Sequence, residues 1–353
     1  MSTANIIILG LGRIGRTLIR NIFYRQLEKK INIVAIIDIV DIEQVVHLLK
    51  YDSTHGINTC DIRKKNQHTL CINQQSIHYY QDIASLEPHI NYQDIDIMLE
   101  CTGKYQNKQQ LQPYLQYGIK KVLLSYPADN SVDDTLIYGI NHMNIVNNAR
   151  IISNGSCTTN CCVPVLSLLH QKYHILQGGM TTIHSAMNDQ NVIDTYHDDL
   201  RLSRSCSESI IPVHTALAKG IARIIPELEN KLESNAVRVP ITNVTAIDLT
   251  LRLKKKADLT AIKTLFMTAS QSQLKGILQY TEMPLVSIDF KQNPHSVIVD
   301  GTQMKLNNGH FIKLLIWCDN EWGFVNRMID VSLFLVSLTK KKHTSFYNTH
   351  HDE

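Results

Sequence analysis

The first part of the chain alternates between two spacings of its apolar residues. Short apolar runs predict strands at 5–9, 31–37, 95–100 and 121–125, and a helical pattern covers 13–24. Strands that are separated by helices form βαβ units, which build a parallel sheet. This region is therefore expected to be an α/β domain.

The pattern changes near residue 150. Residues 244–253, 285–290 and 310–317 have the composition of strands, but no regular helices separate them. This arrangement predicts a mixed or antiparallel sheet, and therefore a second domain. Residues 326–338 are again helical, and a solvated tail is expected after them.

Three glycines directly follow the first predicted strand. Gly10, Gly12 and Gly15 form a G-x-G-x-x-G motif, with Arg13 and Ile14 between the last two. The motif allows a tight turn, a close approach of a pyrophosphate to the backbone, and close packing of helix on strand. The phosphates would bind at the helix N-terminus, where N–H groups and the helix dipole attract anions. A glycine-rich turn without a ligand is the alternative.

An acidic residue follows the second predicted strand. Asp38 lies 23 residues after Gly15, close to the ~20-residue spacing of a ribose-binding acid. A carboxylate there accepts hydrogen bonds from ribose hydroxyls and repels a 2′-phosphate, which favours NAD over NADP. An ordinary turn residue at a strand end is the alternative for Asp38.

Composition and charge exclude several classes of protein. The net charge of +3 gives no electrostatic reason to expect nucleic acid or an anionic membrane as a partner. The N-terminal segment lacks a basic start, so we expect a strand and not a signal peptide, and no apolar run approaches the ~18 residues of a membrane span. The eight cysteines lack the spacing of secreted proteins, which favours a cytoplasmic chain with reduced thiols and no metal site.

A polar turn at 153–156 leads to Cys157 and to a predicted helix. Ser156 can cap that helix, and the positive end of the helix dipole would lower the pKa of the thiol below the ~8.5 of a free cysteine. Because thiolate is the nucleophilic form, this position suits covalent attack on an aldehyde. Cys161 is expected to be a core residue, and Pro164 to limit or kink the helix. A buried, inert Cys157 is the alternative.

The candidate base is His184, in the segment 178–190. Histidine titrates near neutral pH, so it can pair with a thiolate and also move protons. The chain has 16 histidines, and spacing alone does not single out this one.

Several sequence blocks resemble those of the glyceraldehyde-3-phosphate dehydrogenase superfamily. They run in the family's order over nearly the whole chain, and Cys157 and His184 have the family's separation of 27 residues. The resemblance implies that Cys157 is the nucleophile and that His184 activates it. The matching blocks are 10–16, 101–103, 153–161, 181–190, 209–212, 238–240 and 319–323.

The patterns and the resemblance together give a fold class and domain boundaries. We expect an α/β protein with a Rossmann-type, parallel-sheet NAD domain at 1–156, completed by a C-terminal helix at 320–340. A mixed α+β catalytic domain with a largely antiparallel sheet is expected at 157–319, and a tail at 341–353. The 353 residues are sufficient to give both domains a buried core.

Within the superfamily, the chain resembles the erythrose-4-phosphate dehydrogenase branch. The segments 183–190, 241–248, 294–301 and 317–320 fit that branch better than glycolytic enzymes, which usually carry a tyrosine and a threonine shortly after the histidine. The branch implies NAD-dependent oxidation of D-erythrose 4-phosphate to 4-phospho-D-erythronate in pyridoxal 5′-phosphate biosynthesis, with a cysteine thioester that water hydrolyses. The alternatives are a phosphorylating glyceraldehyde-3-phosphate dehydrogenase and a non-catalytic NAD-binding paralogue.

The resemblance also implies roles for further residues. Asp38 would bind the adenosine ribose, and Asn320 would fix the nicotinamide carboxamide. A homotetramer is implied as well, with the segment 190–209 lining a subunit interface. The other cofactor residues would be Gly10, Gly12, Arg13, Ile14, Gly15 and Ser125, and the sugar phosphate would contact Ser156, Thr158, Thr215, Ala216 and Arg238.

Three positions depart from the family pattern. Leu202 stands where an arginine commonly faces the anionic part of the substrate, and the nearby Arg201 and Arg204 could compensate. Ile83 lies near the position of a cofactor-side arginine, and Ala216 replaces the lysine that is usual in this branch. The loss of one charge-assisted phosphate bond would cost about 1.5–3 kcal/mol of binding free energy.

Overall fold

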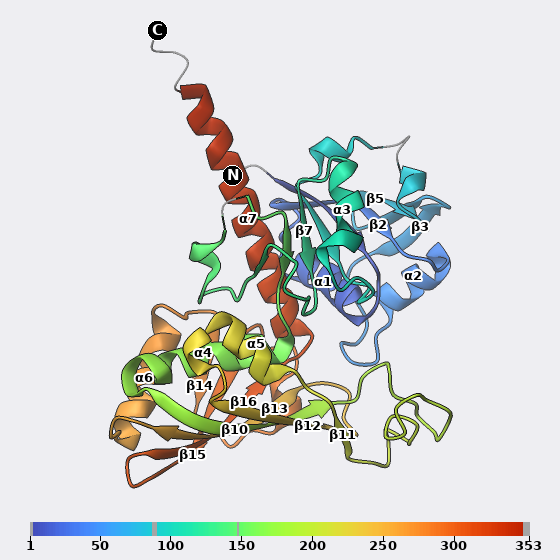
Figure 1. Cartoon of the computed structure of the whole chain (residues 1–353). Coiled ribbons are helices and arrows are strands. Elements are labelled where there is room, and N and C mark those ends of the chain that lie inside the picture. Colours follow the sequence, from blue (N-terminus) through green and yellow to red (C-terminus); the bar gives the residue numbers. More distant parts are fainter. Residues whose placement is uncertain (1–2, 87–89, 147, 349–353) are drawn as a thin grey trace. The chain divides into compact units, whose positions relative to one another are not determined.

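The computed structural model describes residues 3–86, 90–146 and 148–348, with only the helical backbone for 340–348. The chain forms two compact units, each with its own sheet (Figure 1). The sequence does not predict the excursion of 137–143 into the second unit. The first unit comprises Met1–Leu136, Asn144–Gly155 and Val325–Glu353, and the second comprises Ile137–Met143 and Ser156–Phe324.

The first unit is built on a mostly parallel sheet. Its strands are β1 (Ala4–Leu9), β2 (Ile31–Ile37), β3 (Ile62–Asn66), β4 (Thr69–Ile72), β5 (Gln75–Tyr80), β6 (Ile97–Glu100), β7 (Lys121–Leu124), β8 (Asp134–Thr135) and β9 (Ile151–Ser153). The described strands lie in the order β3-β4-β5-β2-β1-β6-β7-β9-β8. All pairings from β5 to β8 are parallel, and those of β3 with β4 and of β4 with β5 are antiparallel.

The central strands of this sheet are buried on both faces. Ile6, Ile7 and Ile8 of β1 are at most 1% exposed, which explains why the strand is a continuous apolar run without alternation. The α-helices of this unit are α1 (Arg13–Tyr24), α2 (Ile42–Lys50), α3 (Lys108–Gln116) and the part of α7 (Trp322–Asn348) from Val325 onward. The unit also has the short 3₁₀ turns η1 (Ala84–Leu86) and η2 (Tyr92–Asp94), and η3 (His142–Asn144) lies at its boundary with the second unit. The α/β class that the sequence predicts is confirmed.

The second unit is built on a mostly antiparallel sheet. Its strands are β10 (Ile175–Ser185), β11 (Ile211–Val213), β12 (Leu232–Val239), β13 (Thr245–Leu253), β14 (Leu278–Thr281), β15 (Val297–Asn307) and β16 (Phe311–Cys318). The described strands lie in the order β11-β12-β10-β13-β16-β15-β14. Only β10 with β12 and β14 with β15 pair in parallel. The mixed, largely antiparallel sheet is therefore as predicted.

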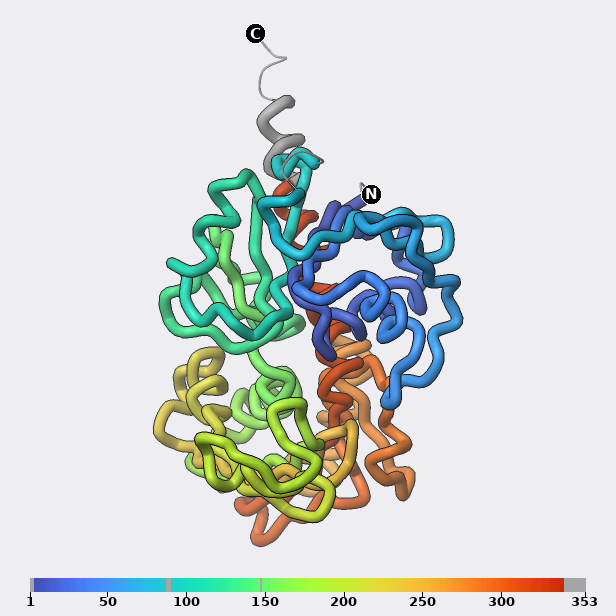
Figure 2. The backbone as a smooth tube through the Cα atoms, turned by 90° about the vertical axis from the view of Figure 1, so that its right-hand side faces the viewer, coloured from blue at the N-terminus to red at the C-terminus, as the bar shows by residue number. Residues whose placement is uncertain are grey.

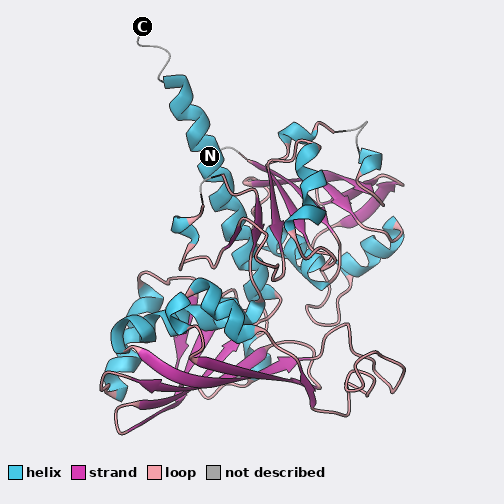
Figure 3. Ribbon diagram, in the orientation of Figure 1, coloured by secondary structure: helices cyan, strands magenta, loops and turns pink. Residues whose placement is uncertain are grey.

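Helices cover one face of this second sheet (Figure 3). They are α4 (Cys157–Tyr173), α5 (Leu217–Ile224) and α6 (Leu259–Gln271), and the unit also has 3₁₀ turns η4 (Pro226–Leu228) and η5 (Ser287–Phe290). A single apolar core joins helices and sheet, with Leu166, Ile247 and Phe266 all fully buried in it. Because α4 is buried over most of its length, it holds its first residue in a fixed place against the sheet.

One local expectation in this unit was wrong, and a second was wrong in part, because Pro164 does not limit the helix that it was expected to limit or kink. No strand forms at 285–290, where Ser287–Phe290 make the 3₁₀ turn η5, because the Asp289 carboxylate accepts the Val286 N–H at 2.8 Å and closes a local turn. Helix α4 does not end at Pro164 but continues to Tyr173. The apolar side chains around Pro164 are fully buried, and that packing outweighs the lost backbone hydrogen bond.

The C-terminal helix is longer than predicted. It was expected to end at 340 and to give way to a tail at 341–353, but α7 continues to Asn348. Residues 340–348 contain no glycine and no proline, so no residue there stops a helix. Residues 349–353 lie outside the described part of the chain.

A long loop joins β10 to β11 at 186–210 (yellow-green in Figure 2). Two backbone hydrogen bonds close it on itself, from Thr195 N–H to the Ser203 carbonyl and from Cys206 N–H to the Asn191 carbonyl, both 2.9 Å. Among the described residues, no helix is both long and apolar enough to cross a bilayer.

Candidate active site

The glycine motif forms the turn between β1 and α1. Gly10 has a φ of +91°, and a Cβ there would lie 2.8 Å from Thr102 Cγ2, so only glycine fits. A Cβ on Gly15 would lie 2.1 Å from the Gly10 carbonyl oxygen, which explains the third glycine. Gly12 is the N-cap of α1 without a side-chain cap, and a Cβ there would meet open space. A pyrophosphate can therefore approach the backbone at this helix N-terminus.

Asp38 follows β2 and lies beside this turn. Its Oδ2 accepts the Leu11 N–H and its Oδ1 accepts the Val40 N–H at 3.3 Å. The Gly10 N–H donates to the Ile37 carbonyl at 2.8 Å, which joins the turn to the end of β2. The carboxylate is thus next to the glycine motif, where the sequence predicts a ribose.

Arg13 and Ile14 form the first turn of α1, and both are half-buried. Arg13 donates two hydrogen bonds to the Asp52 carboxylate, at 2.6 and 3.1 Å. Burial alone would raise the pKa of Asp52, but the bonds from Arg13 and from backbone N–H groups lower it to about 2. Ser125 follows β7 and donates its N–H to the Glu100 carbonyl at 3.0 Å. Ile83 packs against the apolar core of this unit.

Cys157 is the first residue of α4, as the sequence predicts. Ser156 is its N-cap, and Ser156 Oγ accepts the Thr159 N–H at 2.9 Å. The same hydroxyl lies 3.0 Å from Thr158 Oγ1 and 2.7 Å from Thr159 Oγ1. The nucleophile candidate therefore lies within a cluster of hydroxyl groups that can bind an oxygen-rich ligand.

His184 lies near the end of β10 and faces this cysteine. Its Nε2 is 3.8 Å from Cys157 Sγ, and its Nδ1 is 2.8 Å from the Ser185 carbonyl oxygen. Because a carbonyl oxygen can only accept, Nδ1 carries the hydrogen and the lone pair of Nε2 faces the thiol. Burial lowers the pKa of His184, which favours the neutral imidazole that this arrangement requires.

The expected low pKa of the Cys157 thiol is not found. Burial, followed by the neighbouring Cys318, raises the pKa of Cys157 to about 12, and the backbone N–H of Thr158 only partly opposes this. The helix N-terminus acts in the predicted direction, but the loss of water around the thiol outweighs it. Cys161 is fully buried in the core, as predicted. The thiol therefore needs a base beside it, and His184 is in that position.

Arg238 is the partner of His184 in the parallel register of β10 and β12. Its guanidinium donates two hydrogen bonds to the Asp189 carboxylate, at 2.5 and 3.1 Å. Beyond the effect of burial, Arg238 lowers and Asp189 raises the pKa of His184. Sequence reasoning did not assign a role to Asp189, although it lies in the matched block 181–190, because nothing in one sequence pairs it with a distant arginine.

Thr215 and Ala216 lie at the start of α5. Thr215 Oγ1 accepts the Leu217 N–H at 3.2 Å, whereas Ala216, the N-cap, provides no side-chain bond. Helix α5 packs on α4 at Gly220, where a Cβ would lie 2.9 Å from Thr159 Oγ1. This close contact places α5 beside the first turn of α4.

Asn320 lies between β16 and α7. Its Oδ1 accepts from the hydroxyls of Ser185, at 3.3 Å, and of Thr245, at 3.4 Å. The adjacent Asp319 is buried, and its Oδ1 accepts the Trp322 N–H at 2.7 Å. Ser185, which sequence reasoning missed, therefore holds His184 through its carbonyl and Asn320 through its hydroxyl.

Leu202 lies in the β10–β11 loop, as do Arg201 and Arg204. Arg204 Nε donates to Asp194 Oδ2 at 2.8 Å, so its charge is already paired within the loop. Arg201 is exposed. The structure therefore provides no argument that Arg204 replaces the arginine that Leu202 lacks.

Two family signatures match the chain in the order of its two units. The one described as glyceraldehyde 3-phosphate dehydrogenase, NAD binding domain, matches residues 4–108, and the one described as glyceraldehyde 3-phosphate dehydrogenase, C-terminal domain, matches residues 156–320. A glycine turn for a dinucleotide in one unit and a cysteine–histidine pair in the other define an NAD-dependent oxidoreductase. The chain belongs to the glyceraldehyde-3-phosphate dehydrogenase superfamily.

The Asp189 carboxylate is expected to set the acid limb of the activity. Because Asp189 raises the pKa of His184 and Arg238 lowers it, Asp189→Asn is expected to lower this pKa further. The neutral base then persists to lower pH, so the acid limb of kcat/KM should move to lower pH. Steady-state rates between about pH 5 and 8 measure this shift.

Asp194→Asn is the matched control for that change. Asp194 lies in the same loop and also pairs with an arginine, Arg204, but it does not act on His184. The acid limb of kcat/KM for Asp194→Asn should coincide with that of the unmodified protein. An acid limb that moves to higher pH in Asp189→Asn would contradict the assignment.

Proposed function

We propose that this protein oxidises D-erythrose 4-phosphate to 4-phospho-D-erythronate with NAD, as a step in pyridoxal 5′-phosphate biosynthesis. The central observation is the cysteine–histidine pair, in which the lone pair of His184 Nε2 faces Cys157 Sγ at 3.8 Å. Family membership supports a dehydrogenase. The resemblance of 183–190 and 294–301 to the erythrose-4-phosphate dehydrogenase branch supports the choice of substrate.

The chemistry of this proposal follows from the pair. His184 takes the thiol proton while Cys157 Sγ attacks the aldehyde carbon, and the proton passes to the oxygen of the resulting hemithioacetal. His184 then removes that hydroxyl proton as the carbon is oxidised to a thioester, and its cation and the Cys157 N–H stabilise the charge on the oxygen. NAD, when bound, supplies the hydride acceptor. His184 releases that proton to solvent and then takes a proton from the water that attacks the thioester. It returns this proton to the departing Cys157 sulfur, which restores the neutral pair and releases the acid.

Other residues would bind and orient the reactants. The guanidinium of Arg238 is paired with the Asp189 carboxylate, so it would have to exchange that partner to bind a phosphate. The hydroxyls of Ser156, Thr158 and Thr215 are further donors. Asn320 would bind the carboxamide of the cofactor, because two hydroxyls hold its Oδ1 and direct its amide nitrogen away from them.

Two substitutions favour water over inorganic phosphate as the final acceptor. Met187 stands where glycolytic enzymes usually carry a threonine, and Leu202 stands where the family commonly has an arginine. Both changes remove a donor for an inorganic phosphate ion, whereas water needs no such site.

A paired assay of two aldehydes tests the substrate and the acceptor. NADH formation from D-erythrose 4-phosphate is expected to proceed without inorganic phosphate, and to exceed that from glyceraldehyde 3-phosphate. Each aldehyde is assayed with and without phosphate by absorbance of NADH. Strict dependence on phosphate, or a strong preference for glyceraldehyde 3-phosphate, would instead identify the phosphorylating enzyme. NAD binding without turnover of either aldehyde would identify a non-catalytic paralogue.

Replacement of Cys157 tests the covalent step. Cys157→Ser is expected to reduce kcat by at least about 10³-fold, because a serine hydroxyl is a far weaker nucleophile than a thiol. Acid quenching followed by mass spectrometry should detect the acyl adduct in the unmodified protein and not in this variant. Cys161→Ser is the control, since Cys161 is buried one helical turn later and should leave the adduct on Cys157. An adduct that persists in Cys157→Ser would refute the assignment.

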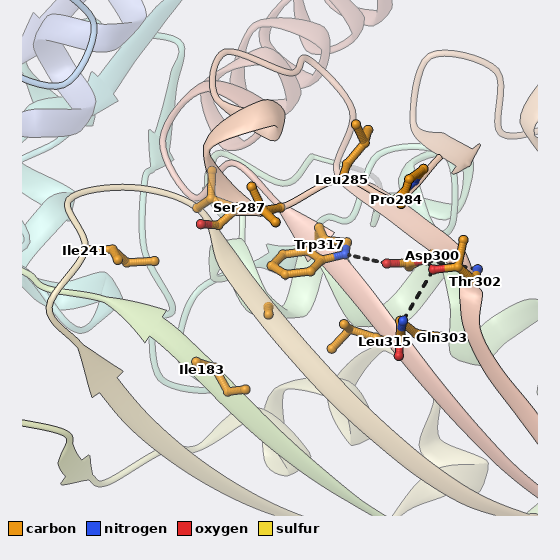
Figure 4. Close-up of a pocket in the computed structure, with 13 residues that line it drawn as sticks. Ile183, Ile241, Pro284, Leu285, Ser287, Asp300, Thr302, Gln303, Leu315 and Trp317 are labelled. Carbon is orange, nitrogen blue, oxygen red and sulfur yellow. Dashed lines mark hydrogen bonds between the residues drawn. The ribbon is translucent and has the colours of Figure 1, made fainter. Parts of the chain in front are cut away.

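We also propose a homotetramer in the cytoplasm, with 190–209 at a subunit interface. Ile193, Tyr196 and Leu200 in that loop are 75%, 102% and 82% exposed, which is unfavourable for a lone subunit. The face of the second sheet opposite α4 also carries an apolar groove of about 520 Å³, beside Trp317 and Leu315 (Figure 4). All eight cysteines are free thiols, which suits a reducing compartment.

Tyr196→Asp tests this interface. A charge in a buried, apolar interface cannot be solvated, so the variant is expected to sediment as a smaller species than the unmodified tetramer. Lys254→Asp provides a control for the change of charge on an exposed residue outside the loop. A monomeric unmodified protein in analytical ultracentrifugation would contradict the proposal.

A further inference from the structure

The carboxyl end of β6 carries a buried carboxylate that the proposed reaction does not use. Glu100 is the last residue of β6 and is 0% exposed. Strand β6 lies between β1, which leads into the glycine turn, and β7, which leads to Ser125. In open parallel sheets the ligand binds outside the carboxyl ends of the strands. Glu100 therefore lies at the NAD-binding edge of this sheet.

Glu100 is bonded to the segments on both sides of it. Its Oε1 accepts the Thr102 N–H at 2.8 Å, and its backbone carbonyl accepts the Ser125 N–H at 3.0 Å. The Gly103 N–H and the Tyr126 hydroxyl also interact with the carboxylate. Gly103 has a φ of +73°, so the 101–103 turn has a left-handed residue that the carboxylate helps to hold.

This turn forms a wall of the glycine motif. A Cβ at Gly10 would lie 2.8 Å from Thr102 Cγ2 and 2.9 Å from Thr102 N, so the two backbones are in close contact. The Cys101 N–H donates to the Leu9 carbonyl at 2.7 Å, just before Gly10. A displaced Thr102 would therefore move the glycine turn, and the carboxylate of Glu100 holds Thr102 in place.

An ionised Glu100 at this buried position costs free energy. Burial raises the pKa of Glu100. Its charge also adds to the effect of burial in raising the pKa of Cys101 and of Tyr126. Removing an ionised group from water is unfavourable unless its hydrogen bonds compensate. An uncharged side chain would avoid this free-energy cost. We therefore infer that the negative charge of Glu100 has a function.

We propose that Glu100 is a positioning residue of the NAD site, whose carboxylate fixes the 101–103 turn against the glycine motif and so sets the affinity for NAD. The inference rests on the NAD-binding domain and not on the identity of the aldehyde. A chain that binds NAD but does not oxidise erythrose 4-phosphate would leave it intact.

Glu100→Gln tests the inference because glutamine has the same shape without the charge. The Kd for NAD of the purified full chain, measured by isothermal titration calorimetry, is expected to rise about tenfold. The kcat at saturating NAD should change by less than about twofold, since Glu100 takes no part in the proposed chemistry. The melting temperature is recorded for each variant.

Asp96→Asn is the matched control, because Asp96 directly precedes β6 at the end of the strand opposite Glu100. Asp96 is also buried, at 5% exposure, and accepts the Asn5 N–H at 3.0 Å and a Lys120 Nζ hydrogen bond at 2.8 Å. This change should lower the melting temperature and leave the Kd for NAD unchanged. An unchanged Kd in Glu100→Gln, or an equal rise of Kd in both variants, would overturn the inference.

Glu100→Asp covers the case in which Glu100→Gln does not fold. It keeps the charge but withdraws the carboxylate by one methylene, so the bond to the Thr102 N–H should be lost. The Kd for NAD is again expected to rise about tenfold. An unchanged affinity in this variant would refute the positioning role.

Discussion

The hydrogen bond between His184 Nδ1 and the Ser185 carbonyl determines whether His184 can accept a proton from Cys157. A carbonyl oxygen only accepts, so the bond at 2.8 Å fixes the hydrogen on Nδ1 and leaves Nε2 free to accept a proton. Without it the imidazole could rotate or carry its hydrogen on Nε2, and the thiol would face a donor. The position of Cys157 at a capped helix N-terminus is useful only because this lone pair faces it.

Burial favours the neutral form of both Cys157 and His184. It raises the pKa of the Cys157 thiol and lowers that of His184, so each group is most stable in its neutral form before a substrate enters. A neutral pair is compatible with a dry site, whereas separate charges there would be costly. In the proposed reaction the proton would move only when the aldehyde oxygen can take up the charge, which would link nucleophilic attack to substrate binding.

Local patterns were sufficient to predict much of the fold. Helix α1 and strand β2 coincide with the predicted ranges, because apolar periodicity and the glycines that precede α1 are local signals. The pattern failed at 285–290, where one aspartate-to-backbone bond made a turn from residues of strand composition. It also failed at the end of α7, where no stop signal exists and sequence alone gives no end point.

The candidate site was predictable only in part. The glycine motif, Asp38 and the cap of α4 are contained in short stretches of sequence, but the Arg238–Asp189 pair and the double role of Ser185 arise from the folding of distant strands. The pKa of Cys157 was wrongly predicted for a similar reason. A helix N-terminus is visible in a sequence, whereas the water that the surrounding core removes from the thiol is not.

The parallel register of β10 with β12 has a consequence for how this protein can vary. Successive side chains of a strand point to opposite faces, so Ile183 lines the groove on one face while His184 faces the thiol on the other. Inserting or deleting one residue in β10 would exchange the two faces and remove the imidazole from the site at a single step. Between β10 and β11, length changes are tolerable beyond Ser185, in the loop, because they leave the alternation of side chains in the strand unchanged.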